Sequence, residues 1–136
     1  SGKLWKNIKT FKKLTMQVFR IHESDPVKFT GGLSFRPVVE KHGMGFSVHK
    51  TVIPKGGPHK WHYKHHIEAC YCIRGRGILT DLKTGVAAHI TPDVVYLLDN
   101  HEEHTFEAIE DTVLISIFNP PCKGNETHDK DGNYSI

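Results

Sequence analysis

The amino-acid sequence predicts an all-β protein, either a sandwich or a barrel of short strands. Short apolar or alternating segments recur along the 136 residues, and turn-forming sequences such as KTG, TPD and DNHEE separate them. Long helical periodicity, by contrast, is hard to find. Several short strands at this spacing are typical of sandwiches and barrels.

The predicted strands follow the apolar segments and end where turn-forming residues begin. In chain order they cover residues 17–21, 33–39, 45–53, 68–73, 77–81, 86–89, 94–98, 104–107 and 112–118. Pro120 and Pro121 end the last strand, because proline has no N–H to donate to a sheet. Residues 4–14 are predicted to form a short helix, so one or two short helices are expected beside the strands.

Length and composition fit a single domain over residues 1–136, without repeat, linker or second domain. Residues 1–14 form a basic extension, and residues 119–136 form a polar tail that is expected to cover the barrel mouth. The lysines of the extension are interpreted as a solvated segment, because no nucleic-acid-binding motif accompanies them. No apolar run approaches the roughly 20 residues of a membrane span. Neither nucleic acid nor a membrane is therefore expected as a partner.

Three cysteines, Cys70, Cys72 and Cys122, cannot all pair within one chain. The C-x-C spacing in a strand points both thiols to the same face, which favours burial over a disulfide. It is not the spacing of a structural zinc site. Unpaired thiols indicate a reduced compartment, so a cytoplasmic protein is expected.

The stretch HKWHYKHHIEACYC, residues 59–72, holds four histidines within eight positions and then a glutamate. The imidazoles alone fit metal ligands, pocket residues or a polar loop. Glu68 opens a strand and shares its inward face with the two thiols of Cys70 and Cys72. A carboxylate in a dry core is costly, so Glu68 is expected to be held by a metal or by a buried partner.

This block and a later one resemble the two motifs of the cupin family. In the first motif, Glu68 is followed after six residues by Gly75; in the second, a turn with Pro92 precedes a single histidine, His104. The resemblance implies a cupin-type β-barrel, or jelly roll. Cupins usually carry His-x-His before the glutamate, and this chain reads HYK there. Lys64 is protonated near neutral pH and is a poor ligand, which leaves the usual set incomplete.

A narrower resemblance covers most of the chain. The stretches that carry it are GMGFSVHKT (43–51), WHYKHHIEACYCIRGRG (61–77), VVYLLDNHEEHTF (94–106) and IFNPPCKGNETHD (117–129). Together they are similar to the ectoine synthase family, a group of cupin enzymes. That resemblance implies a metal site of Glu68, Tyr96 and His104, in which Tyr96 replaces the missing histidine. Such oxygen and nitrogen donors suit Fe(II), with Zn(II) as the other option, and three protein ligands leave an open position.

The resemblance also implies the reaction. It is the metal-dependent, intramolecular cyclisation of N-γ-acetyl-L-2,4-diaminobutyrate to ectoine, an osmolyte (compatible solute) of the stress response, with loss of water. The enzyme would be a hydro-lyase and a homodimer. The expected catalytic residues are Tyr63, His66, Glu126 and His128. The expected substrate-binding residues are Ser34, Arg36, Thr51, Tyr63, His66, Phe118, Glu126 and His128, with Arg36 as the partner of the substrate carboxylate.

One departure from the family concerns the pocket. The family usually has a tryptophan just before the strand with its serine and arginine, whereas this chain reads GGLSFR, with Gly32 or Leu33 at that place. A wider pocket, or a substrate such as another short acylated diamine or glutamine, therefore stays open. Two other classes also stay open: another metal-dependent cupin enzyme, an oxygenase or isomerase, and a cupin that only binds a small molecule.

Overall fold

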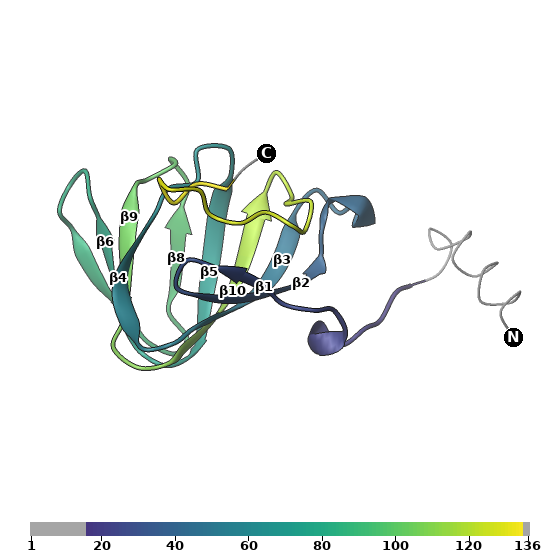
Figure 1. Ribbon diagram of the computed structural model, residues 1–136, viewed down its shortest axis with the longest axis horizontal. Helices are drawn as coiled ribbons and strands as arrows, with labels where there is room; N and C mark the ends of the chain where they lie inside the picture. Colours follow the sequence, from purple (N-terminus) through teal and green to yellow (C-terminus); the bar gives the residue numbers. More distant parts are fainter. Residues whose placement is uncertain (1–15, 135–136) are drawn as a thin grey trace, which may run out of the picture.

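Two antiparallel sheets face each other in the computed structural model, which describes residues 16–134 (Figure 1). The larger sheet has the strand order β1-β2-β3-β10-β5-β8, and the smaller sheet has the order β4-β9-β6-β7. The strands are β1 (Val27–Phe29), β2 (Gly32–Val38), β3 (Ser47–Ile53), β4 (Gly56–Trp61), β5 (Ile67–Arg74), β6 (Gly77–Asp81), β7 (Ala87–Ile90), β8 (Val95–Leu98), β9 (His104–Ala108) and β10 (Thr112–Asn119). Two short 3-10 helices accompany them, η2 (Ile21–Glu23) and η3 (Glu40–His42).

The all-β prediction is confirmed, and every strand predicted from residue 33 onward has a counterpart. The predicted strand 17–21 is wrong. Val18 there is 85% exposed and η2 begins at Ile21, so the alternating pattern has no sheet to bury it. The predicted helix 4–14 and the basic extension 1–14 lie outside the described residues.

Two strands, β1 and β4, were not predicted from the sequence pattern. β1 has only three residues, and β4 begins with Gly56, Gly57 and Pro58, which are turn-forming residues with low strand propensity. Pairing with β9 holds β4 in place, with a shift of register between Gly56 and His59. The neighbouring strand, and not local propensity, makes this segment extended.

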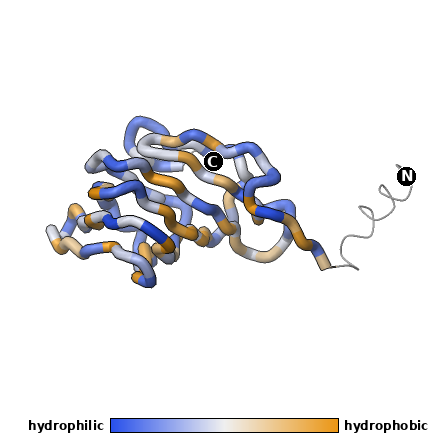
Figure 2. Tube along the Cα trace, turned by 90° about the horizontal axis from the view of Figure 1, so that it is seen from below, coloured by the Kyte–Doolittle hydropathy of each residue, from blue (hydrophilic) through white to orange (hydrophobic). Residues whose placement is uncertain are grey.

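Alternation along the strands separates an inner from an outer face, and Figure 2 shows hydrophobic and hydrophilic residues changing places along the tube. On β3, residues 47, 49, 51 and 53 are all buried, whereas the residues between them are half-buried. The apolar core includes Ile53, Ile90, Phe106 and Leu114. The buried polar side chains in strands are Ser34, Arg36, Ser47, His49, Thr51, Glu68, Thr112 and Ser116 on the larger sheet and His104 on the smaller. Polar groups thus gather along one wall of the interior, where a site can form.

The segment after β10 passes over the ends of the strands, as the yellow ribbon in Figure 1 shows. The Cys122 N–H donates to Ser47 Oγ at 2.9 Å, and the Lys64 N–H donates to Asn133 Oδ1 at 2.9 Å. Gly132 has φ +79°, and a Cβ there would lie 2.2 Å from the Lys60 carbonyl oxygen. Only glycine lets the segment approach β4 so closely.

In the described part of the chain, no helix has the length and apolar character needed to cross a membrane.

Candidate functional site

A small cavity lies inside the barrel. Its lining residues are Phe29, Thr51, Ile53, Trp61, Tyr63, Glu68, Tyr96, Leu114, Ser116, Phe118 and Tyr134. Five of the predicted site residues, Thr51, Tyr63, Glu68, Tyr96 and Phe118, are among them. The cavity has a volume of about 10 Å³, which is room for about one water molecule or an ion. We refer to it as the barrel cavity.

Glu68 and Tyr96 reach the barrel cavity from adjacent strands, β5 and β8. Glu68 is 8% exposed and has no cationic partner among residues 16–134. Burial raises its pKa from 4.5 to about 7, although hydrogen bonds from Cys70 and Ser116 lower it. Burial also raises the pKa of the Tyr96 hydroxyl well above 10. Two oxygen donors are therefore held in one apolar surrounding without a positive charge to balance them.

His104 comes from the opposite sheet, on β9, and is buried. Its Nδ1–H donates to the Glu102 carbonyl oxygen at 2.9 Å, which leaves the lone pair of Nε2 free. Burial lowers the pKa of His104, so the ring is neutral near neutral pH. The ring lies 5.9 Å from that of Tyr63, although His104 itself is not among the residues that line the barrel cavity. A histidine fixed in this tautomer is ready to act as a ligand.

Arg36 links strand β2 to the tail. Its Nε donates to Ser34 Oγ at 3.0 Å, and its Nη2 donates to the Tyr134 hydroxyl at 3.5 Å. Its Nη1 lies 3.5 Å from Glu126 Oε1, yet makes no well-formed hydrogen bond there. The Arg36 side chain is 3% exposed, and Nη1 has an unfilled donor in the described structure, which an anion can take up.

Glu126 turns the tail back on itself. Its carboxylate accepts the N–H groups of Lys123 at 2.6 Å and Gly124 at 2.9 Å. Burial by itself raises the pKa of Glu126, but these backbone donors and Arg36 outweigh burial and hold the pKa below its usual value. Glu126 is therefore a carboxylate near neutral pH.

Tyr63, which lines the barrel cavity, forms a hydrogen-bonded pair with His128. The Tyr63 hydroxyl donates to Nε2 of His128 at 2.7 Å, because burial raises the pKa of Tyr63 and lowers that of His128 to about 3. The His128 ring is stacked between Tyr134, at 4.8 Å, and Trp61, at 5.6 Å. With Nε2 as acceptor, Nδ1 carries the proton, and it has no partner among the described residues.

His66 lies beside this pair. Its Nδ1–H donates to the Pro120 carbonyl oxygen at 2.8 Å, so the lone pair is on Nε2, which is buried and has no described partner. One ring nitrogen of His66, Sγ of Cys122 and one carboxylate oxygen of Glu126 lie within 4.8 Å of one another. All three side chains are buried. This group, called here the thiol cluster, is a set of residues that can hold a metal ion.

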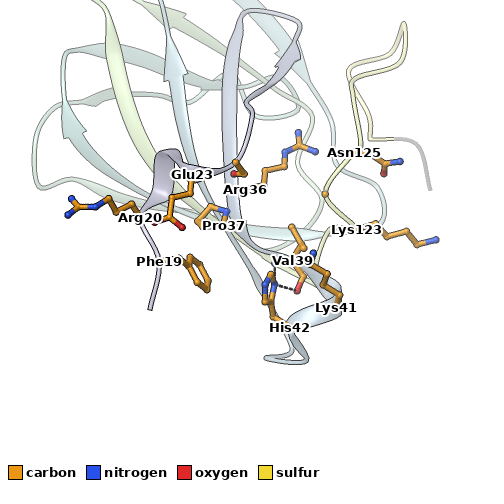
Figure 3. A pocket seen from close by; sticks show the side chains of 12 residues that line it. Phe19, Arg20, Glu23, Arg36, Pro37, Val39, Lys41, His42, Lys123 and Asn125 are labelled. Carbon is orange, nitrogen blue, oxygen red and sulfur yellow. Dashed lines mark hydrogen bonds between the residues drawn. The ribbon is translucent and has the colours of Figure 1, made fainter. Parts of the chain in front are cut away.

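A larger hollow than the barrel cavity lies elsewhere. A groove of about 450 Å³ lies on the outside, between the segment that leads into β1, the η3 turn and the tail (Figure 3). Among the predicted site residues only Arg36 lines it. Arg20, Lys41 and Lys123 stand around its rim (Figure 3). Its width and solvent exposure fit a surface groove, and the chemically matched groups lie inside the barrel.

Sequence reasoning missed several residues of the interior. Trp61, Phe29 and Tyr134 line the barrel cavity, and the ring centroids of Trp61 and Phe29 lie 5.7 Å apart. His49 is fully buried, and neither ring nitrogen has a partner among residues 16–134. Of these residues, only His49 could have been predicted to be buried, because it is the third residue of strand β3, in which every other residue is buried. Trp61 and Tyr134 lie in segments whose position depends on distant contacts.

The other histidines divide into several groups. His65, His89 and His101 are exposed, whereas His59 is a half-buried residue of strand β4 rather than of a loop. The imidazole of His62 lies 3.5 Å from the Glu103 carboxylate. Most of the histidine-rich stretch therefore surrounds the cavity and does not enter it.

The close packing around Gly32 explains why this position holds a glycine and not the tryptophan of the family. A Cβ at this position would lie 2.1 Å from the Val52 carbonyl oxygen and 3.2 Å from the Phe29 ring. The backbone of β2 passes too close to β3 for a tryptophan here. Phe29 and Trp61 supply aromatic surface to the same cavity instead.

Comparison with known proteins agrees with the geometry. The sequence profile of a family described as ectoine synthase matches residues 16–136. The L-ectoine synthases of Desulfosudis oleivorans and Desulfatibacillum aliphaticivorans are 47% and 45% identical, over 78% and 76% of this chain and 83% and 79% of their own.

Solved structures give the same result. The crystal structure of ectoine synthase from P. lautus matches with a TM-score of 0.75 and 36% identity, over 80% of this chain and 81% of that one. An RmlC-like cupin from Shewanella frigidimarina matches with a TM-score of 0.60 and 15% identity, over 78% of this chain and 92% of its own, a likeness of fold alone. The barrel is thus a cupin barrel, and the chain belongs to the ectoine synthase family of hydro-lyases.

Proposed function

We propose that this protein closes N-γ-acetyl-L-2,4-diaminobutyrate to ectoine with loss of water, using a bound iron(II) ion. The α-amine attacks the acetamide carbonyl carbon, the amine gives up two protons, and the carbonyl oxygen leaves as water. The observation that carries the proposal is the buried carboxyl group of Glu68 on the wall of the barrel cavity, with no cationic partner among residues 16–134. It is left free for a ligand of opposite charge.

The donor set fits a divalent metal. Glu68 is a buried acid with no cationic partner in the described part of the chain, Tyr96 offers a second oxygen beside it, and the lone pair of His104 is on Nε2. Buried charges are normally paired or bound to metals. When bound, iron acts as a Lewis acid that makes the amide carbonyl more electrophilic. Zn(II) is the other metal that these donors suit.

Arg36 is proposed to bind the substrate carboxylate. A guanidinium presents parallel N–H groups that match both carboxylate oxygens, and Nη1 still has a free donor. Ser34 fixes the side chain through Nε, and Thr51 and Ser116, whose hydroxyls lie 3.0 Å apart, offer further polar contacts. Holding one end of a flexible substrate brings the amine to the carbonyl, which lowers the entropic part of the barrier.

His128, Tyr63 and His66 are proposed to move the protons. His128 is neutral and carries a hydrogen on Nδ1 that has no partner among residues 16–134. When Nδ1 gives up this proton, Tyr63 can supply another to Nε2 through their hydrogen bond. His66 has a free lone pair on Nε2 and can take a proton from the attacking amine. Glu126, a carboxylate beside Arg36, is suited to hold the cationic amidine product. Phe118 is proposed as an apolar wall of the cavity.

The tail is proposed to cover the substrate. The barrel cavity has a volume of about 10 Å³, far too little for an acetylated diamino acid, and Tyr134 is one of the residues that line it. Part of the lining must therefore move to admit the substrate, and Tyr134 belongs to the same segment as Glu126 and His128. Folding the tail over the substrate would exclude water from the ring-closing step.

The direct test is product formation. Fe(II)-loaded protein is incubated with N-γ-acetyl-diaminobutyrate, with and without dioxygen, and ectoine is measured by chromatography. Ring closure consumes no oxidant, so equal yields are expected in both atmospheres. No ectoine in either atmosphere would overturn the assignment, and a product formed only with dioxygen would favour an oxygenase.

The roles of the residues are tested separately. Glu68→Ala, Tyr96→Ala and His104→Ala should each lower bound iron sharply. Arg36→Ala should keep its iron and lose substrate binding, because the described contacts of Arg36 are with Ser34, Tyr134 and Glu126 and not with a proposed iron ligand. Iron content measured beside calorimetric substrate binding separates the two groups, and loss of iron in the Arg36 variant would contradict the division.

A homodimer in the cytoplasm completes the proposal. The outward face of β10, β5 and β8 leaves Tyr71, Ile73, Val95, Leu97 and Ile117 exposed, an apolar patch of the kind that a second copy covers. The three cysteines are all buried and unpaired, which supports a reduced compartment. Sedimentation over a range of concentrations tests the oligomeric state.

A further inference from the structure

A second group of metal-ligand side chains lies outside the proposed iron ligands. In the thiol cluster, an imidazole, a thiol and a carboxylate come from the loop before β5 and from two points of the tail. Their donor atoms lie within 4.8 Å of one another, and His66, Cys122 and Glu126 are 4%, 0% and 6% exposed. Three different donor types that meet in a buried place indicate a metal site more strongly than any one of them alone.

The distances suit a tetrahedral ion after a small adjustment. Ligand bonds of about 2.0–2.3 Å around zinc place the donors roughly 3.5 Å apart. The donor atoms lie within 4.8 Å of one another, so each separation must shorten by at most about 1.3 Å. Two of the three residues, Cys122 and Glu126, belong to the tail.

His66 supplies an independent sign that a ligand is missing. Its Nδ1–H is bonded to the Pro120 carbonyl oxygen, and Nε2 is buried with no partner in the described structure. A ring fixed in this way by a backbone carbonyl has its free lone pair on the other nitrogen, the arrangement typical of histidines that bind metals. The cluster also has charge to balance a cation, since Glu126 is ionised. Burial raises the pKa of Cys122 to about 12, so the thiol gives up its proton only when the cation binds, which weakens the site.

We propose that the thiol cluster binds a soft divalent cation, zinc or cadmium in particular, at a site separate from the iron ligands. A thiolate favours such ions over iron(II), whereas the proposed iron site has only oxygen and nitrogen donors. Arg36, 3.5 Å from Glu126, opposes the second charge of the cation, so the site is weaker than a structural zinc site.

Binding has a consequence that rests on the proposed function. His66 and Glu126 are also proposed substrate contacts, so an ion held by them and the substrate exclude each other. Zinc should then inhibit competitively, even when the iron site is filled. The tail, held by Cys122 and Glu126, would stay closed over the barrel.

Cobalt(II) tests the binding without any assay of turnover, because a cobalt–thiolate bond has a near-ultraviolet charge-transfer band. The band should appear when Co²⁺ is added to the iron-loaded protein under anaerobic conditions. It should be absent in Cys122→Ser and present in Cys70→Ser, the matched control, whose thiol is 1% exposed beside the proposed iron site. No band in the unsubstituted protein, or a band that only the Cys70 variant loses, overturns the proposal.

Inhibition is the second measurement. The zinc concentration that halves activity should rise by at least about tenfold in Cys122→Ser, with turnover in the absence of zinc unchanged. Equal inhibition of Cys122→Ser and Cys70→Ser by zinc would refute the inhibitory site. A protein that makes no ectoine but shows the Cys122-dependent cobalt band would refute the proposed function and leave the metal site standing.

Discussion

Replacing Glu68 by glutamine is expected to stabilise the metal-free protein, and to do so mainly at high pH. The carboxyl group is buried, and burial raises its pKa from 4.5 to about 7. An acid with a raised pKa binds its proton more tightly in the native state than in the unfolded chain. Ionisation therefore favours unfolding, and native stability falls as the pH rises from 4.5 to about 7. Glutamine keeps the shape and never ionises.

The magnitude follows from the size of the shift. At about 1.4 kcal/mol per pKa unit, the change from 4.5 to about 7 destabilises the native protein by about 3 kcal/mol at pH 8. At pH 5 most of the carboxyl is still protonated in the native state, and the same relation gives under about 1 kcal/mol. Other groups titrate over this range too, but they cancel in the difference between variant and parent.

Urea unfolding of chelator-treated protein at pH 5 and pH 8 measures this difference. Glu40→Gln, at an exposed position in η3, is the matched control and should change stability by less than about 0.5 kcal/mol at either pH. Adding Fe(II) should reverse the order at pH 8, because the ion binds only the parent's carboxylate. A Glu68 variant no more stable than the parent at pH 8, or equally stabilised at both pH values, would refute the reasoning.

Four further results are expected. Arg36→Lys should raise KM by at least about tenfold with iron content unchanged, since an ammonium cannot bond both carboxylate oxygens in parallel; kinetics beside a metal assay check it. Tyr63→Phe deletes the 2.7 Å bond to His128 and should cost about 1–2 kcal/mol, so an unchanged urea midpoint would contradict that bond. Gly32→Ala sets a methyl group 2.1 Å from the Val52 carbonyl oxygen and should cost about 1–3 kcal/mol by the same assay. A chelator should abolish turnover, and Fe(II) should restore it; full activity after complete metal removal would exclude a metal-dependent reaction.

The strands that the sequence predicted are those with a regular local pattern. β3 alternates without a break, and Glu68 stands out on β5 because it interrupts an apolar face. By contrast, β4 is extended only because β9 lies beside it, and the alternation in 17–21 has no sheet to join. Local pattern thus decides strands only where a partner strand is available.

The residues of the candidate site also fall into those that the sequence predicted and those that it did not. Resemblance selected Arg36, Glu126 and His128, and the structure brings all three together at the tail. It could not reveal Tyr134, because a tyrosine near a chain end has no period or motif, and its position is set by stacking on His128. Trp61 is hidden in the same way, since its ring direction depends on strand pairing.

The division of the interior between strands and tail has a genetic consequence. Glu68, Tyr96 and His104 are encoded before residue 119, where the last strand ends, whereas Glu126 and His128 come after it. A stop codon just past Lys123 would leave every sheet intact and spare the proposed iron-holding triad. The shortened product would accumulate iron yet turn over nothing, so cofactor content alone would be a misleading sign of a working gene.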